Sequence, residues 1–190
     1  MTQTPDNTET PGPLDTTQPR PPGDTGLRPL VFYLIVLIVF GADQWSKMWI
    51  QKTLGYEQSR PIFGNSFLLT LTHNTGGAWG MLPHGNPIFI GFALVAAVAL
   101  LFAYHRVARP DSLIAGAFAL ALGGAFGNLL DRLRHGYVVD FFEARIIHWP
   151  IFNVADSAIS LSIVLLLIHF FRSAKADANE AISTAQRTAE

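Results

Sequence analysis

Two aspartates beside long apolar stretches are the residues of this chain that are best placed to do chemistry. Asp140 follows two valines and precedes two phenylalanines, and Asp156 lies at the start of the last apolar stretch. A carboxylate next to hydrocarbon is costly, so it marks a candidate functional site. Two carboxylates on one membrane face would split their affinities for protons, which suits acid and base chemistry.

The composition indicates a membrane protein. Of the 190 residues, 49% are hydrophobic and only 14% are charged, whereas soluble domains carry roughly 25% charged residues. The net charge of −1 and the absence of a basic stripe predict no nucleic-acid partner. The chain has no cysteine, and its six histidines show no paired ligand spacing. We therefore expect no metal site.

Four apolar segments are predicted to be transmembrane helices, each needing about 20 residues. They are residues 30–50, 88–104, 112–130 and 153–171. The Pro- and Thr-rich residues 1–27 are predicted to be a disordered tail, and residues 173–190 a polar tail. The expected fold is therefore an all-α membrane domain, residues 28–172, with four transmembrane helices.

An up-and-down arrangement of these helices would bring the unusual polar residues to one membrane face. The end of the first helix, the end of the third and the start of the fourth would meet there, and Asp140 would lie in the loop between the last two helices. The residues that converge are Asp43, Lys47, Asn128, Asp131, Arg132, Asp140, Asn153 and Asp156.

The connection between the first two helices is too long for a tight turn. Residues 66–72 have strand-forming side chains, and a glycine-rich loop follows from Asn74 to Gly80. We expect a small β element whose apolar residues rest on the membrane or hold an apolar substrate. These residues are Phe63, Phe67, Trp79, Met81 and Leu82.

Structural roles compete with functional ones at several of these positions. Asp43 and Lys47 are four residues apart and could form an ion pair that closes the helix. Asn74 precedes Thr75 and two glycines, as in an ordinary turn.

The polar residues of the last two helices leave similar choices. Asn153 and Asp156 resemble a capping box, in which the helix end would favour an ionised Asp156. Asn128 and Arg132 share a helix face and could hold peptide carbonyls or orient a carboxylate. Arg132 could equally pair with Asp131 or with lipid phosphate. Asp140 has no such structural explanation.

Five sequence blocks resemble the lipoprotein signal peptidase family (signal peptidase II). They are residues 43–47 (DQWSK), 74–80 (NTGGAWG), 123–132 (GGAFGNLLDR), 138–141 (VVDF) and 152–157 (FNVADS). The resemblance covers residues 30–171, and the blocks follow the family order.

The resemblance implies an aspartyl endopeptidase of the bacterial inner membrane. Such an enzyme removes signal peptides from diacylglyceryl-modified prolipoproteins, cutting just before the lipidated cysteine. Asp140 and Asp156 match the catalytic pair. The residues matching substrate-binding and supporting positions are Asn128, Arg132, Asn153, Asn74, Asp43 and Lys47.

The resemblance also implies a topology and a set of partners. Both termini would be cytoplasmic, and the site would lie near the extracytoplasmic face beneath the β element, which matches the family's surface cradle. The partners would be prolipoprotein substrates and membrane lipids, and we expect a monomer that needs no cofactor.

Two other classes of function are compatible with a small membrane protein that carries acids. A small proton- or cation-coupled transporter could use the same acids, but its acids should be spread through the depth of the bilayer. A non-enzymatic membrane scaffold would leave Asp140 without a role.

Overall fold

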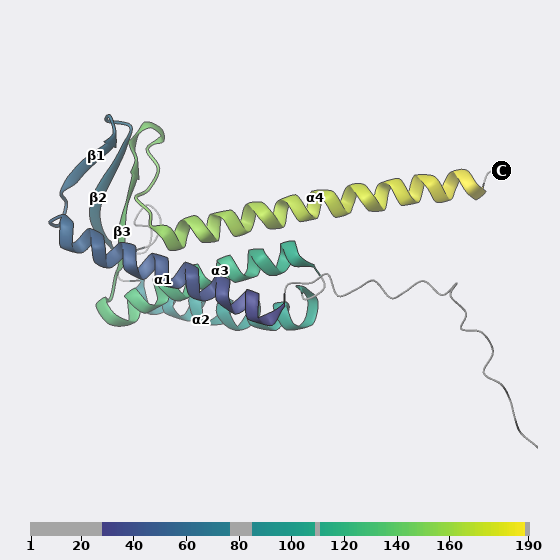
Figure 1. The fold of residues 1–190 in the computed structure, drawn as a ribbon, viewed down its shortest axis with the longest axis horizontal. Helices are drawn as coiled ribbons and strands as arrows, with labels where there is room; N and C mark the ends of the chain where they lie inside the picture. The colour runs from purple at the N-terminus through teal and green to yellow at the C-terminus, as the bar shows by residue number, and fades with distance from the viewer. Residues whose placement is uncertain (1–27, 77–84, 109–110, 189–190) are drawn as a thin grey trace, which may run out of the picture.

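The chain forms a bundle of helices with a small sheet at one end (Figure 1). A computed structural model describes residues 28–76, 85–108 and 111–188. The predicted tail of residues 1–27 lies outside this part, as do Trp79, Met81 and Leu82. The described helices are α1 (Pro29–Thr53), α2 (Asn86–Ala103), α3 (Ser112–His135) and α4 (Val154–Thr188), and a π-helical turn, η2 (Tyr104–Ala108), extends α2.

These four helices are long and apolar enough to cross a membrane, which confirms the predicted spans. Helix α3 shows how local sequence sets the ends. The Asp111 carboxylate accepts hydrogen bonds from the Leu113 and Ile114 N–H groups at 2.8 and 3.1 Å, as an N-cap residue does. At the other end Gly136 adopts φ 78°, a conformation that favours glycine. Helix α4 has 35 residues, so it continues well past the apolar segment that ends at Phe171.

Helix α3 is the centre of the bundle, because it packs against α1, α2 and α4. Its glycines make this close approach possible. A Cβ atom on Gly123 would lie 2.8 Å from the Val39 Cβ atom, and one on Gly124 would lie 2.5 Å from the Ala155 carbonyl oxygen. A Cβ atom on Gly127 would overlap the Asp43 carboxylate. The small residues of α3 therefore allow close helix packing.

The sheet contains three antiparallel strands in the order β1 (Ser59–Phe63), β2 (Phe67–Asn74) and β3 (Val138–Ala144). The first two strands confirm the predicted β element between α1 and α2. The third strand corrects the sequence analysis, which placed Asp140 in a loop. In the structure Asp140 lies opposite Thr72 of β2, and the β-branched and aromatic residues around it are typical of a strand.

The third strand is deeply buried. Val138, Val139, Asp140 and Phe141 are each no more than 2% exposed. Val139 and Phe141 form a core cluster with Leu71 of β2 and Ile50 at the end of α1. The sheet is thus anchored to α1, and β3 holds Asp140 against the ends of the helices.

Candidate active site

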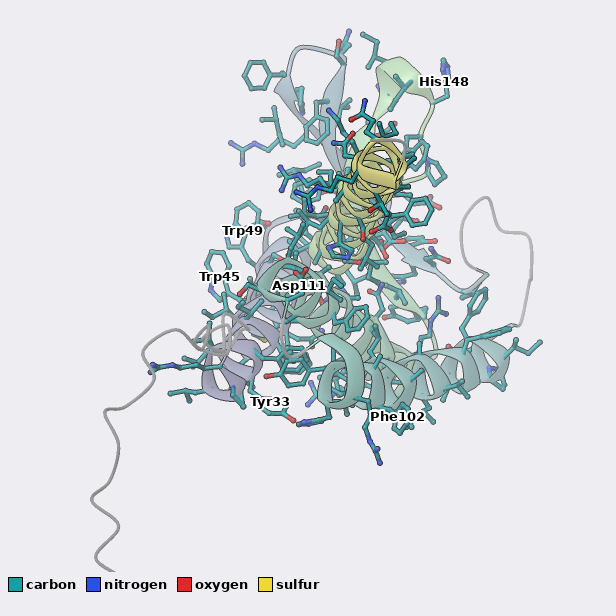
Figure 2. The ribbon with its side chains drawn as sticks, turned by 90° about the vertical axis from the view of Figure 1, so that its right-hand side faces the viewer. Tyr33, Trp45, Trp49, Phe102, Asp111 and His148 are labelled. Carbon is teal, nitrogen blue, oxygen red and sulfur yellow. The ribbon has the colours of Figure 1, made fainter. Side chains whose placement is uncertain are left out.

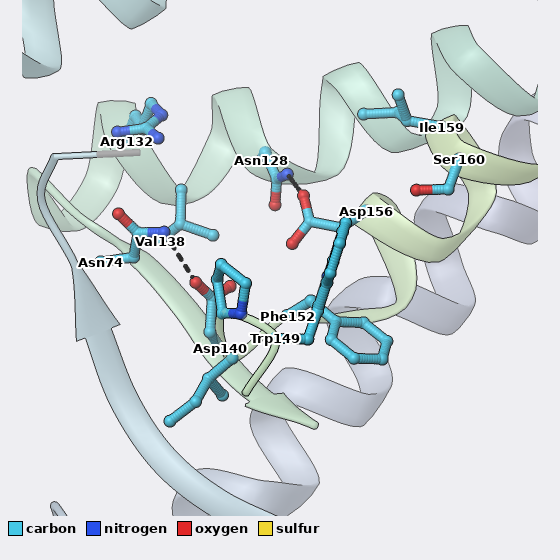
Figure 3. A pocket seen from close by; sticks show the side chains of 12 residues that line it. Asn74, Asn128, Arg132, Val138, Asp140, Trp149, Phe152, Asp156, Ile159 and Ser160 are labelled. Atoms are coloured by element: carbon cyan, nitrogen blue, oxygen red, sulfur yellow. Dashed lines mark hydrogen bonds between the residues drawn. The ribbon is translucent and has the colours of Figure 1, made fainter. Parts of the chain in front are cut away.

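All eight predicted site residues lie at the end of the bundle that carries the sheet. Figure 3 shows five of them around one cavity: Asn74, Asn128, Arg132, Asp140 and Asp156. Helix α1 supplies Asp43 and Lys47, the last turns of α3 supply Asn128 and Arg132, and β2 and β3 supply one residue each. The remaining two lie just before α4 (Asn153) and in its first turn (Asp156). The residues from the strands are Asn74 and Asp140.

Asp140 is held by two amide groups. Its Oδ2 atom accepts a hydrogen bond from Asn74 Nδ2 at 2.9 Å, and its Oδ1 atom accepts one from Asn153 Nδ2 at 2.6 Å. The Asn74 side chain also accepts from the Gly76 N–H group at 3.2 Å. Asn74 therefore makes the predicted turn and orients Asp140 at the same time.

Asp156 is held by an amide and by the backbone at the start of α4. Its Oδ1 atom accepts from Asn128 Nδ2 at 2.8 Å, and its Oδ2 atom accepts from the Asn153 N–H group at 3.2 Å. In return, Asn153 Oδ1 accepts from the Asp156 N–H group at 2.9 Å. This reciprocal pair confirms the predicted capping box. Because Asn153 also binds Asp140, the helix cap links the two carboxylates.

A second group of charged side chains, centred on Lys47, is linked to Asp156 through Asn128. Lys47 Nζ is 2.8 Å from Asp43 Oδ2 and 2.9 Å from Asp131 Oδ2. It also donates to Asn128 Oδ1 at 2.9 Å. Since an ammonium group can only donate, this contact fixes the oxygen of Asn128 toward Lys47 and its NH₂ group toward Asp156. The predicted ion pair of Asp43 and Lys47 is confirmed, and it also sets the orientation of Asn128.

The partner of Asp131 differs from the one that sequence suggested. Its carboxylate contacts Lys47 and accepts from the Val139 N–H group at 3.0 Å, so it ties α3 to β3. Arg132 instead lies over the Phe89 ring of α2, 4.4 Å from its centroid, and lines the cavity described below.

Gln44 is a residue of this end to which sequence reasoning gave no role. Its side-chain NH₂ group donates to Asp43, to Asp131 and to the Gly127 carbonyl oxygen at 3.1 to 3.2 Å. Its position next to Asp43, near the end of an apolar helix, was a usable signal. Gln44 helps to satisfy the two carboxylates that hold Lys47.

Asp140 and Asp156 line a cavity of about 260 Å³. Figure 3 shows Arg132 and Asn128 along one side, with Trp149 and Phe152 nearby. Burial, together with the negative charge of Asp156, raises the pKa of Asp140 to about 7. Near neutral pH this cavity can therefore hold one protonated carboxyl group beside a second carboxylate, which is the state that acid–base catalysis requires. Within the described ranges, no group of three or more His, Asp and Glu side chains is arranged to hold a metal ion.

The fold and the site define a multi-pass membrane protein with a pair of acids in a cavity at one end of its helices. A family model described as signal peptidase (SPase) II matches residues 35–172. The chain belongs to this family, and it is a membrane peptidase.

Individual relatives agree with this assignment. The lipoprotein signal peptidase of Moorella thermoacetica is 43% identical over 135 residues, which cover 71% of this chain and 89% of that protein. The lipoprotein signal peptidase of Alteromonas mediterranea is 38% identical over 170 residues, covering 85% and 91%. A bacterial membrane enzyme solved by the in meso method at 2.3 Å has a TM-score of 0.74 and 28% identity, with 78% and 92% of the two chains covered.

Proposed function

We propose that this peptidase is an aspartic endopeptidase that removes signal peptides from diacylglyceryl-modified prolipoproteins, with Asp140 and Asp156 as its catalytic pair. The observation that carries the proposal is that both carboxylates line one cavity and each is oriented by two hydrogen-bond donors. The relatives named lipoprotein signal peptidase support the choice of substrate.

The two acids have different environments, which supports different roles. The pKa of Asp140 is raised to about 7, so a large share of the protein carries the Asp140 proton near neutral pH. Asp156 lies in the first turn of α4, where the helix end stabilises negative charge. We assign Asp140 as the acid that faces the scissile carbonyl and Asp156 as the base.

The reaction then follows in two steps. Asp156 takes a proton from a water molecule while the water oxygen attacks the carbonyl carbon, and the Asp140 proton stabilises the developing oxyanion. The C–N bond then breaks, and the proton held by Asp156 passes to the leaving nitrogen. Asp140 keeps its proton at the end of the cycle. The pair titrates as a unit, so the roles describe the reactive protonation state.

The neighbours of the pair support substrate binding as well as orientation. Arg132 contributes a positive charge to the cavity wall, and its stacking on Phe89 limits its movement. A guanidinium group can donate to the carbonyl oxygens of an extended peptide. We propose that Arg132 and Asn128 bind the peptide, whereas Asn74, Asn153, Asp43 and Lys47 position the acids.

The surface of α1 supports a site at a membrane boundary. Trp45 and Trp49 point outward from α1 (Figure 2), and both are exposed. They flank Lys47 in the sequence, and tryptophan is enriched where hydrocarbon meets water. These residues are therefore expected to mark the interface at the level of the charged cluster.

We further propose that the enzyme lies in the bacterial inner membrane with cytoplasmic termini and an extracytoplasmic sheet. The chain has no cysteine, so single cysteines at Arg60 of β1 and Lys175 of α4 can report its topology. An impermeant maleimide should label Arg60→Cys in intact spheroplasts and Lys175→Cys only after lysis. The reverse pattern would invert the proposed topology.

One chain brings all eight residues together, which supports a monomeric enzyme. The same geometry gives the transporter alternative no support. Asp43, Asp131, Asp140 and Asp156 gather at one end of the bundle rather than through its depth.

The function is tested by incubating the purified protein with a diacylglyceryl-modified precursor, in parallel with its Asp140→Asn variant. The wild-type protein should release the signal peptide and leave the lipidated cysteine at the new amino terminus of the lipoprotein. The variant should leave the precursor uncut. Intact precursor after incubation with folded wild-type protein would overturn the proposal.

A further inference from the structure

The start of α2 holds Arg132, although none of the described residues that line the cavity of the acid pair comes from α2. The Arg132 Nη1 atom donates to the Asn86 Oδ1 atom at 3.5 Å, and the Asn86 Nδ2 atom donates to the Arg132 carbonyl oxygen at 3.3 Å. The centroid of the Phe89 ring is 4.4 Å from the Arg132 Cζ atom. One amide therefore contacts both the backbone and the end of the Arg132 side chain, while the ring supports the face of the guanidinium group.

Arg132 is held in this way without a carboxylate partner. It is only 9% exposed, yet no carboxylate of the described residues forms an ion pair with it, and the neighbouring Asp131 contacts Lys47 instead. A guanidinium group has five N–H donors, and Asn86 accepts from one of them. A neutral acceptor thus directs the group and leaves its charge and its other donors for a peptide. The 3.5 Å contact is long for a hydrogen bond, so the group can still shift toward a bound carbonyl oxygen.

A fixed guanidinium group favours peptide binding for an entropic reason. An arginine side chain has many rotamers, and ordering it in one of them costs conformational entropy. When Asn86 and Phe89 order the side chain before the peptide arrives, that cost is not taken from the binding free energy. This effect should lower KM without changing the chemistry at the acids.

We infer that Asn86 is a positioning residue for peptide binding, and that it acts through Arg132 together with Phe89. The inference rests on the proposed function, in which Arg132 binds carbonyl oxygens of the extended peptide. The start of α2 is then part of the substrate-binding machinery, although residues 86–89 belong to none of the five sequence blocks that resemble the family.

The contribution of α2 is tested by measuring KM and kcat for the diacylglyceryl-modified precursor in one detergent. Asn86→Leu removes the acceptor at similar size and should raise KM about three- to tenfold, the effect expected from one lost hydrogen bond. Phe89→Leu removes the ring and should raise KM about threefold, as expected for a lost cation–π contact. In both variants kcat should stay within about twofold of the wild-type value, because only binding is weakened.

Two matched controls separate the contact with Arg132 from a general effect on α2. Phe89→Tyr keeps the ring face and should retain the wild-type KM. Phe92→Leu removes a ring three residues further along α2, where the side chain is 69% exposed, and should also leave KM unchanged.

A double-mutant cycle shows whether the effect passes through the guanidinium group. Arg132→Met keeps an unbranched side chain but removes the charge, and it should itself raise KM. In this background Asn86→Leu and Phe89→Leu should each change KM by less than about twofold, because the group that they position is absent. A merely structural role would give the same rise in KM with and without the guanidinium group.

Each outcome bears on a different claim. Additive effects in the cycle, a fall in kcat in place of a rise in KM, or an unchanged KM in folded Asn86→Leu would overturn the inference. Asn86→Ala provides the same measurement if Asn86→Leu does not fold. A wild-type KM in Arg132→Met would overturn both the inference and the assignment of Arg132 to peptide binding. Absence of cleavage by the wild-type protein would instead overturn the proposed function.

Discussion

Two pairs of aspartates at the same end of the bundle have opposite surroundings. Asp43 and Asp131 are bridged by one ammonium group, with Lys47 within 2.9 Å of each carboxylate. Asp140 and Asp156 are instead held by side-chain amides and a backbone N–H group, and both line a cavity. The first pair is buried and shares the single positive charge of Lys47. The second pair lines the cavity and has an adjustable charge, because the pKa of Asp140 is raised to about 7.

The comparison shows that surroundings, rather than residue type, divide structural acids from reactive ones. Asp43 and Asp131 form an ion-pair group with Lys47 that ties α1 to α3. A buried carboxylate with amide donors and another acid nearby can change protonation state near neutral pH. Asn128 joins the two pairs, because its oxygen binds Lys47 and its NH₂ group binds Asp156.

The largest effect is expected from neutralising the cavity acids. Asp140→Asn and Asp156→Asn should each reduce kcat by roughly 10⁴-fold or more while the protein remains folded, because the two groups act as a unit. For the same reason the double variant should be little worse than either single one. Single-turnover cleavage of the lipidated precursor measures this. Appreciable turnover by either single variant would remove that residue from the pair.

Removing the lysine should damage the fold itself. Lys47→Met leaves Asp43 and Asp131 buried without their cation, and breaking a buried ion pair typically costs about 3–5 kcal/mol. Thermal unfolding in detergent should shift to lower temperature.

The matched control for this variant is Arg145→Met, which breaks the exposed ion pair with Glu143 and should leave the unfolding temperature nearly unchanged. Equal shifts for the two variants would contradict the distinction between buried and exposed pairs.

The adjustable charge of the cavity pair should appear in the pH profile. The pKa of Asp140 is raised to about 7, so the residue is protonated below that pH and ionised above it. As the mechanism needs its proton, kcat/KM should fall by about tenfold per pH unit once the pH is well above 7. Circular dichroism at each pH controls for unfolding. A constant kcat/KM from pH 6 to 9 would exclude Asp140 as the acid.

A smaller effect is expected at Asp131. An asparagine there can still accept from the Val139 N–H group, and Lys47 keeps its contact with Asp43. Asp131→Asn should therefore retain measurable peptidase activity in the assay that finds Asp140→Asn inactive. A folded Asp131→Asn enzyme as inactive as Asp140→Asn would place Asp131 among the reactive acids.

The smallest effect is expected from the amino-terminal tail. Residues 1–24 contain none of the sequence blocks shared with the family and no apolar periodicity. A truncated protein should insert into the membrane and cleave the lipidated precursor at the wild-type rate. Loss of cleavage by a normally inserted truncation would give the tail a role.

Much of the site could be anticipated because its residues lie near the ends of apolar segments. The alternation of four spans puts Asp43, Asn128 and Asp156 on one membrane face without knowledge of any contact. The exact partners could not be anticipated, because they join residues far apart in the chain. Asp131 illustrates this, since its neighbour in sequence is Arg132 but its carboxylate contacts Lys47 of α1.

The sequence by itself determined the four spans, the end of the bundle at which the acids gather and the capping box of α4. Each of these follows from local hydropathy or from spacing within one helix, where neighbours in sequence are neighbours in space. Only the tertiary structure decided that Asp140 lies on a strand, that Lys47 orients Asn128, and that Asp131 contacts Lys47 rather than Arg132. These features depend on how α1, α3, α4 and the sheet pack together, and packing is determined by the whole chain.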